Sequence, residues 1–278
     1  MSRFDLLAPF AAWAGPLAEV PDAAFADELL GDGLALDPLE GVMRAPCDAE
    51  VVSVASTGHS ITLQHATGAE ILLHIGIDSV NLGGRGFEPL VRPGAVVDAG
   101  QPLVRFDLDV VARGATSLMT PLILLGDGLR LADKVADRQV APGERIATVV
   151  IAATGDARDS ASPEVLTARQ ALRVVLANGI HARPAARIAA ALKPLAADLD
   201  IVARNRRANA RSITALLKLD IRRDEAILVE ARGREAPAAV AAVSAIVLSD
   251  CETEYHSPEA AETAPPADAS VDPHRLRG

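Results

Sequence analysis

Residues 153–168 divide this chain into two halves whose apolar residues follow different spacings. The segment, Ala-Thr-Gly-Asp-Ala-Arg-Asp-Ser-Ala-Ser-Pro-Glu-Val-Leu-Thr-Ala, has no sustained apolar periodicity and is typical of a linker. Because 278 residues suffice for roughly two domains, we predict two separately packed units. Their expected bounds are 1–150 and 170–251, with a linker at 151–169 and a disordered, Pro- and Ala-rich tail at 252–278.

The first half is predicted to be an all-β sandwich or barrel-like domain. Its apolar segments are short, rich in Val, Ile and Leu, and separated by Gly and Pro turns. We expect helices only near Asp22–Leu30 and Leu108–Arg113. The expected strands include residues 51–54, 60–63, 70–75 and 102–106.

The second half alternates strand and helix spacings, which predicts an α+β open-faced sandwich with helices on one side of a sheet. The strands are expected at residues 172–176, 199–203 and 227–231, and the helices at 181–195, 212–219 and 236–248.

The composition narrows the class of protein further. Hydrophobic residues make up 50% of the chain but aromatic residues only 3%, so the cores must consist of Ala, Val, Leu and Ile. The sequence contains no run of about 18 apolar residues that could span a membrane. Residues 1–5 do not resemble a signal peptide. Cys47 and Cys251 are too few for a disulfide framework, and Cys47 fits a structural core position. We expect a cytoplasmic protein.

Charge is distributed unevenly between the halves. Residues 1–150 contain 10 basic and 20 acidic residues, whereas residues 171–250 contain 13 basic and 8 acidic ones. An acidic and a basic domain on one chain can attract each other. Nucleic-acid binding by the basic half is the alternative, but that half lacks aromatic stacking platforms and a helix-turn-helix pattern.

His181 follows the turn signal Asn178-Gly179 and precedes a predicted helix in the string Asn-Gly-Ile-His-Ala-Arg-Pro-Ala-Ala. Pro184 fits the first helical turn, so His181 is expected at the helix N-terminus, where backbone N–H groups favour an anion. Arg183 adds a fixed positive charge. A phosphoryl group on His181 would therefore be stabilised, although a histidine that only caps the helix is the simpler alternative.

The string resembles the active site of HPr, the histidine phosphocarrier of the bacterial phosphoenolpyruvate-dependent sugar phosphotransferase system, over roughly residues 170–250. The resemblance implies that His181 carries the phosphate and that Arg183 assists transfer. It also makes Ser212 a candidate regulatory phosphorylation site, for which a plain N-cap is the alternative. The run Arg204-Asn205-Arg206-Arg207 departs from the family's usual Asn-Gly turn.

His59 and His74 lie 15 residues apart in strand-like segments, with Gly68 in a turn between them. Hairpin pairing would bring the two imidazoles side by side, as phosphoryl acceptor and partner or as metal ligands. A zinc site needs a third ligand, and none occurs at a typical spacing. We therefore expect no metal and no other cofactor. His65 is expected to be solvated on a loop, and two unrelated surface histidines remain the alternative for His59 and His74.

The first half resembles the glucose-type enzyme IIA of the same system, from about Pro9 to Val150. The most specific part of the resemblance is the motif His74-Ile-Gly-Ile-Asp78, together with its spacing from the motif Thr57-Gly-His59. The resemblance implies the family's duplicated hybrid β fold, a phosphorylated His74 and a His59 that stabilises the phosphate. It also implies that Asp22 and Asp78 ring the site and that Thr57 orients an imidazole. We expect these carboxylates to hold a histidine tautomer.

Together the resemblances imply a phosphoryl relay for sugar uptake. Enzyme I would phosphorylate His181, His181 would pass the phosphate to His74, and His74 would pass it to an enzyme IIB. The partners would be enzyme I, the enzyme IIB/IIC permease as the sole link to a membrane, and regulatory targets of enzyme IIA, but no nucleic acid. A regulatory protein whose phosphorylation state signals sugar availability is the alternative.

Two further alternatives concern other parts of the chain. The segment Pro93–Leu103 resembles a lipoyl or biotinyl carrier hairpin, but it contains no lysine to modify. The tail has the composition of a linker to enzyme I, so we expect a protein truncated before, or ending before, that domain. The sequence does not identify the sugar, and it leaves open the oligomeric state and whether transfer occurs within one chain.

Overall fold

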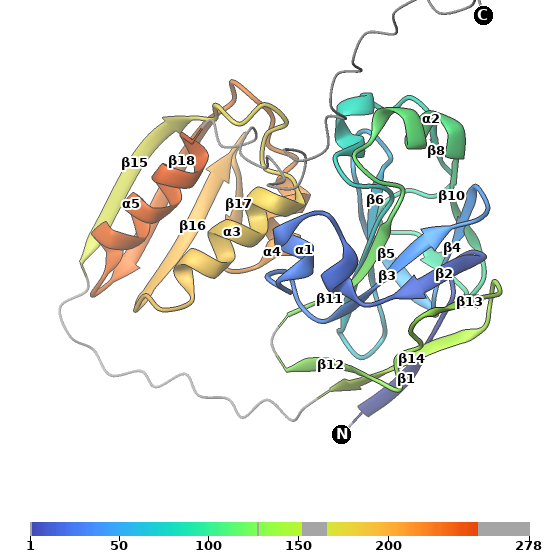
Figure 1. The fold of residues 1–278 in the computed structure, drawn as a ribbon. Helices are drawn as coiled ribbons and strands as arrows, with labels where there is room; N and C mark the ends of the chain where they lie inside the picture. The colour runs from blue at the N-terminus through green and yellow to red at the C-terminus, as the bar shows by residue number, and fades with distance from the viewer. Residues whose placement is uncertain (1, 127, 152–165, 250–278) are drawn as a thin grey trace, which may run out of the picture.

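The chain folds into an N-terminal β domain and a C-terminal α+β domain that lie against each other, as the computed structural model in Figure 1 shows. The structure describes residues 2–126, 128–151 and 166–249. The predicted tail and most of the predicted linker lie outside these residues. Within them, no helix is long and apolar enough to cross a membrane.

The N-terminal domain is built on an eight-stranded sheet in the order β13-β2-β3-β11-β7-β6-β5-β9, flanked by the three-stranded sheets β1-β14-β12 and β4-β10-β8. The large sheet comprises β2 (Ala12–Gly15), β3 (Gly33–Pro38), β5 (Ala49–Val54), β6 (Ser60–Gln64), β7 (Glu70–His74), β9 (Val96–Val97), β11 (Thr120–Leu125) and β13 (Arg138–Val140). The small sheets comprise β1 (Ser2–Leu7), β4 (Val42–Arg44), β8 (Phe87–Pro89), β10 (Pro102–Phe106), β12 (Leu129–Ala132) and β14 (Arg145–Ile151).

Helices in this domain are short, as predicted. They are η1 (Leu17–Glu19), α1 (Ala23–Ala26), η2 (Ser79–Leu82) and α2 (Leu108–Gly114). Asp22 and Asp107 cap α1 and α2, respectively, by accepting hydrogen bonds from the backbone amides of Ala24 and Val110.

The N-terminal core lies between the sheets, and alternate strand residues fill it. On β6, for example, Ile61 and Leu63 are fully buried in this core, so Thr62 between them lies on the opposite face of the sheet. Cys47 is buried, and burial raises the pKa of its thiol to about 12, which fits a structural role. His65 lies on a loop as expected and is partly exposed, with its ring stacked on Phe4 at 3.7 Å.

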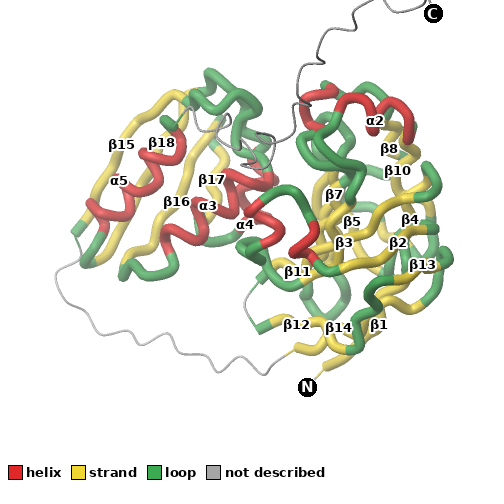
Figure 2. Tube along the Cα trace, viewed as in Figure 1, coloured by secondary structure: helices red, strands yellow, loops and turns green. Residues whose placement is uncertain are grey.

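The C-terminal domain is an antiparallel sheet in the order β15-β18-β16-β17 with its helices on one side. Figure 2 shows α3 and α5 lying on that face of the sheet. Its core is aliphatic, as the composition predicts. The elements are β15 (Thr167–Arg173), α3 (Ala182–Leu192), β16 (Ala197–Ala203), β17 (Arg206–Asn209), α4 (Ile213–Leu219), β18 (Ala226–Gly233) and α5 (Ala236–Val247).

Two strands of this domain differ from the prediction. β15 begins at Thr167, inside the predicted linker, because it pairs along its whole length with β18 from Thr167↔Arg232 to Arg173↔Ala226. The sequence missed β17, which follows a tight turn at Arg204 and Asn205, whose φ angles are 48° and 60°. The arginine-rich run that departs from the usual Asn-Gly turn therefore still forms a hairpin with left-handed backbone at both central positions.

The two domains share a buried apolar contact, which we call the interdomain cluster. The N-terminal domain contributes residues from η1, α1 and the outward face of the large sheet, and the C-terminal domain contributes residues from α3 and α4. The cluster consists of Leu17, Val20, Ala24, Phe25, Leu30, Ala35, Leu72, Ile77, Ile123, Leu125, Ala182 and Ala186, with Met119, Ile213 and Leu217 packed against it.

Candidate active site

His59 and His74 lie side by side on neighbouring strands, as the hairpin prediction requires. β6 and β7 are antiparallel with Ser60 opposite His74, and the turn between the strands contains Gly68 at φ 85°. The two ring centroids are 4.8 Å apart and nearly perpendicular. Both side chains are buried, with 3% and 4% of the residue surface exposed, which excludes the alternative of two unrelated surface histidines.

Hydrogen bonds fix both rings. Nδ1 of His74 lies 2.9 Å from the carbonyl oxygen of Gly76, and Nδ1 of His59 lies 2.5 Å from Oγ1 of Thr57. Because a carbonyl oxygen only accepts, His74 carries its proton on Nδ1 and has its lone pair on Nε2. The expectation that carboxylates set the tautomer is therefore wrong for His74, where a backbone carbonyl does so.

Both imidazoles are held neutral. Burial, followed by the nearby His181, lowers the pKa of His74 to about 4. Burial, followed by His74 and His181, also lowers the pKa of His59 well below its usual range. A neutral imidazole keeps a lone pair that can attack an electrophile without a separate base, which is the chemistry that the burial of His74 favours.

His181 reaches this site from the other domain. It is the N-cap residue of α3 with an extended backbone, and its carbonyl oxygen accepts from the amide of Ala185, which places it at the predicted helix N-terminus. His181 and His74 line the same interdomain cavity of about 10 Å³, together with Phe25, whose ring centroid is 5.3 Å from that of His74. This volume holds about one water molecule.

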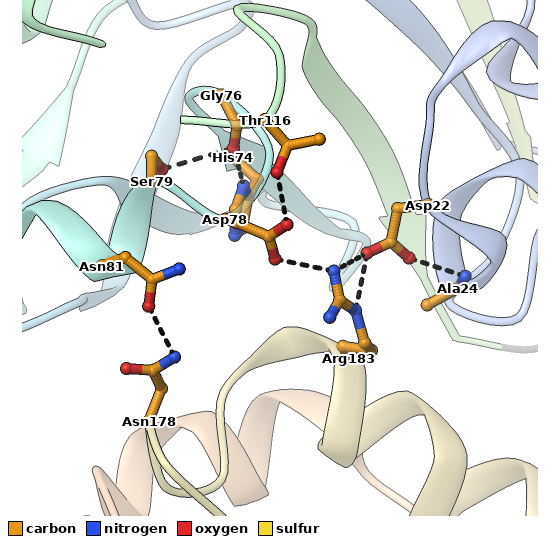
Figure 3. Close-up of polar contacts among 10 residues, drawn as sticks. All are labelled: Asp22, Ala24, His74, Gly76, Asp78, Ser79, Asn81, Thr116, Asn178 and Arg183. Atoms are coloured by element: carbon orange, nitrogen blue, oxygen red, sulfur yellow. Dashed lines mark hydrogen bonds and ion pairs between the residues drawn. The ribbon is translucent and has the colours of Figure 1, made fainter. Parts of the chain in front are cut away.

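Arg183 lines this cavity and connects the domains through the polar contacts drawn in Figure 3. Its Nε donates to Oδ2 of Asp22 at 2.6 Å, and its Nη2 donates to Oδ1 of Asp78 at 2.8 Å. The remaining oxygens of the carboxylates accept from the amide of Ala24 at 2.8 Å and from Oγ1 of Thr116 at 2.7 Å. The two acidic residues expected around the site thus contact the arginine expected beside His181.

Two further polar contacts join the domains, and no sequence pattern predicts them. Nδ2 of Asn178 donates to Oδ1 of Asn81 at 2.9 Å (Figure 3), and Oγ1 of Thr214 donates to Oε2 of Glu70 at 2.5 Å. Each joins residues of different domains that are about a hundred or more positions apart, so no local pattern indicates them.

Ser212 lies outside the histidine centre. It is the exposed N-cap of α4, and its hydroxyl accepts from the amide of Ala215 at 3.2 Å. The plain N-cap role is therefore present, and regulatory phosphorylation stays a prediction.

The arrangement has the chemistry of group transfer between imidazoles. Two buried, neutral histidines of one domain meet a helix-capping histidine of the other, and no cluster of three His, Cys, Asp or Glu side chains in the described ranges could hold a metal ion. Imidazole nitrogens of both domains thus lie around one small cavity, in a site assembled by domain contact.

Comparison with known proteins assigns each half to a family. Residues 4–128 match the model of the phosphoenolpyruvate-dependent sugar phosphotransferase system, EIIA 1, and residues 168–249 match the PTS HPr component phosphorylation site. A glucose-specific EIIA component of Bacillus cereus is 40% identical over 119 residues, which are 43% of this chain and 72% of that protein. The chain belongs to the sugar phosphotransferase system. It joins an EIIA domain to an HPr domain.

Other relatives agree with this assignment of the EIIA domain. The structure of glucose permease IIA from Mycoplasma capricolum is 36% identical and covers 53% of this chain and 96% of that chain, with a TM-score of 0.51. The N-acetylglucosamine-specific EIICBA component of Escherichia coli is 40% identical over 123 residues, which are 44% of this chain and 19% of that protein. The predicted β fold of the EIIA domain is confirmed.

Proposed function

We propose that the chain relays a phosphoryl group from His181 of the HPr domain to His74 of the EIIA domain. The observation that carries this proposal is the double contact of Arg183 with Asp22 and Asp78, because it seats the N-terminus of α3 over the EIIA site. His181 then lines the same cavity as His74. Positioning of this kind supplies most of the catalysis in phosphoryl transfer.

The transfer step exchanges one nitrogen–phosphorus bond for another. The bond to a ring nitrogen of His181 breaks and leaves its electron pair on that ring. The lone pair of Nε2 on His74 forms the new bond, while Nδ1 keeps its proton and donates it in a hydrogen bond to the Gly76 carbonyl oxygen. Each ring keeps the proton of its other nitrogen, so no proton has to cross the interface.

His59 is proposed to steady the phosphoryl group after arrival. Its Nδ1 lies against the Thr57 hydroxyl. If that hydroxyl donates, the remaining ring proton is on Nε2 and is free to donate to a phosphoryl oxygen on His74, whose ring lies 4.8 Å from that of His59. Thr57 is thus a positioning residue that acts through His59.

Arg183 offsets the negative charge that the phosphoryl group would otherwise meet. Asp22 and Asp78 repel an incoming phosphoryl oxygen unless a cation lies between them. Arg183 lies there when the HPr domain is docked on the EIIA domain, an arrangement that we call the closed state. The cavity between His74 and His181 has room for about one water molecule, which limits hydrolysis of the labile nitrogen–phosphorus bond there.

The proposed partners are enzyme I, which would phosphorylate His181, and an enzyme IIB in the cytoplasm, which would accept from His74. Segments similar to this EIIA domain occur within the N-acetylglucosamine-specific and glucosamine-specific EIICBA components, and the Bacillus cereus relative is glucose-specific. This supports a glucose or amino-sugar permease as the destination.

Phosphorylation with enzyme I and phosphoenolpyruvate, read by mass spectrometry at alkaline pH, tests the relay. Phosphate is expected on His181 and His74 of the parent chain, and on His181 alone in His74→Ala. In His181→Ala, His74 should remain unmodified. Phosphate on His74 of the His181→Ala chain at the parental rate would contradict the relay.

A further inference from the structure

Thr62 lies on the docking face of the EIIA domain. It is on β6, between the core residues Ile61 and Leu63, and it is paired with Leu72 on β7. Leu72 belongs to the interdomain cluster, against which Leu217 of α4 packs. Thr62 and Leu217 also line one interdomain cavity of about 330 Å³. The side chain of Thr62 therefore faces the HPr domain.

The hydroxyl of Thr62 is buried without a hydrogen bond. The residue is 1% exposed, and Oγ1, which presents almost no accessible surface even to that cavity, has no hydrogen-bond partner among the residues that the structure describes. Other hydroxyls near the interface are satisfied: Oγ1 of Thr214 donates to Glu70, and Oγ1 of Thr57 contacts Nδ1 of His59. An orphaned hydroxyl disfavours the state that buries it, by roughly five- to hundredfold in an equilibrium constant.

The closed state also has to end in every cycle. It covers His74 to 4% exposure, so no further protein can take phosphate from His74 until the HPr domain moves away. Because both domains belong to one chain, the EIIA site meets the HPr domain at a high local concentration. The interdomain cluster and the Arg183 ion pairs add to closure. An opposing contribution within the interface would keep closure reversible.

We propose that Thr62 is the residue that limits closure, because its hydroxyl regains a hydrogen bond to water only when the HPr domain leaves. Thr62 then sets how readily His74 becomes available to the next acceptor. The functional role of Thr62 rests on the proposed relay, but the effect of Thr62 on docking of the HPr domain does not depend on phosphoryl transfer. Thr62→Val tests it, because valine keeps the shape and removes the orphaned oxygen.

Closure is measured by the rate at which diethyl pyrocarbonate modifies His74 in the full chain, read by mass spectrometry. His65 serves as the internal reference, because it lies away from the interface against Phe4. In Thr62→Val, modification of His74 should slow about five- to hundredfold relative to His65. Thr62→Ser, which keeps the hydroxyl, should stay near the parental rate.

Thr214→Val is the matched control of opposite sign. It removes a hydrogen bond that joins the domains, so His74 should be modified faster. Thermal unfolding of each variant verifies that it is folded. An unchanged or faster modification of His74 in a folded Thr62→Val chain would overturn the proposal.

The onward step gives a second readout. In Thr62→Val, transfer from His181 to His74 should keep its rate, whereas transfer from His74 to an added enzyme IIB should slow in parallel with the modification of His74. If His74 is phosphorylated without His181 while modification still slows in Thr62→Val, the relay fails and the role of Thr62 in closure stands. If the relay operates and modification does not slow, the role of Thr62 fails alone.

Discussion

The guanidinium of Arg183 and the carboxylate of Asp22 are 161 positions apart in the chain, yet they form a 2.6 Å hydrogen bond across the domain interface. Asp22 is almost fully buried, with 3% of its side chain exposed, and 27% of the Arg183 side chain is exposed. Removing either partner of such a charge pair would leave the other charge buried and unpaired, so docking of the domains depends on both residues. The contact therefore reports the closed state, in which His181 and His74 line one cavity.

Arg183→Gln should slow transfer from His181 to His74 by roughly 30-fold or more, since truncating one partner of a buried charge pair costs about 2–5 kcal/mol. Single-turnover transfer from chain phosphorylated on His181 measures this. Arg187→Gln, one turn further along α3, is the control for the change in net charge. Asp22→Asn and the double variant complete a cycle, and strictly additive losses would show that the two residues do not act together.

The stability of the EIIA domain should fall with pH between about 6.5 and 4. The folded domain holds the pKa of His74 at about 4, whereas the unfolded chain binds that proton near 6.5. The unfolded state therefore gains protons first as the pH falls, which costs about 2 kcal/mol of stability between pH 7.5 and 5.

Trp13 is the single tryptophan of the chain and lies in the EIIA domain, so its fluorescence follows unfolding of that domain in denaturant. The parent should lose about 2 kcal/mol more than His74→Gln over this pH interval. Equal losses in the two proteins would show that His74 is not held neutral.

Thr57→Val should slow transfer to His74 about tenfold, which corresponds to the loss of one hydrogen bond that orients His59. Thr57→Ser keeps the hydroxyl and should restore most of the rate. Because Thr57 acts through His59, His59→Ala should make the Thr57 substitution nearly silent. A Thr57→Val chain that transfers at the parental rate would remove Thr57 from the site.

Ser212→Ala should destabilise the HPr domain by about 1 kcal/mol, because it removes the N-cap of α4. Ser212→Asp keeps a capping oxygen and should lose less. Denaturant unfolding followed by helical circular dichroism measures both. Equal losses in the two variants would contradict stabilisation of α4 by a capping oxygen at position 212.

The sequence predicted the parts of the site that depend on local pairing. His59 and His74 could be placed together because one hairpin joins their strands, and His181 because a turn and Pro184 mark a helix N-terminus. The contact of Arg183 with Asp22 and Asp78 could not be predicted, since it arises from docking of two domains. β17 was missed because Arg-Arg-Ala-Asn lacks the β-branched alternation of a strand.

The roles predicted for the two acidic residues of the site were less accurate than the predicted positions of the histidines. The carboxylates of Asp22 and Asp78 were expected to hold an imidazole, but they bind Arg183, and the Gly76 carbonyl holds His74. A backbone carbonyl carries no signal in the sequence. The orphaned hydroxyl of Thr62 is likewise visible only once the interface is formed.

The most direct test of the relay is the concentration dependence of transfer within the full chain. Chain phosphorylated on His181 is diluted over a hundredfold range, and the appearance of phosphate on His74 is timed. Transfer inside one closed chain predicts a rate constant that does not change with dilution, and much slower transfer when a His74→Ala donor chain is mixed with a His181→Ala acceptor chain. A rate that falls in proportion to concentration, with the mixed chains as fast as the parent, would contradict transfer through the closed state.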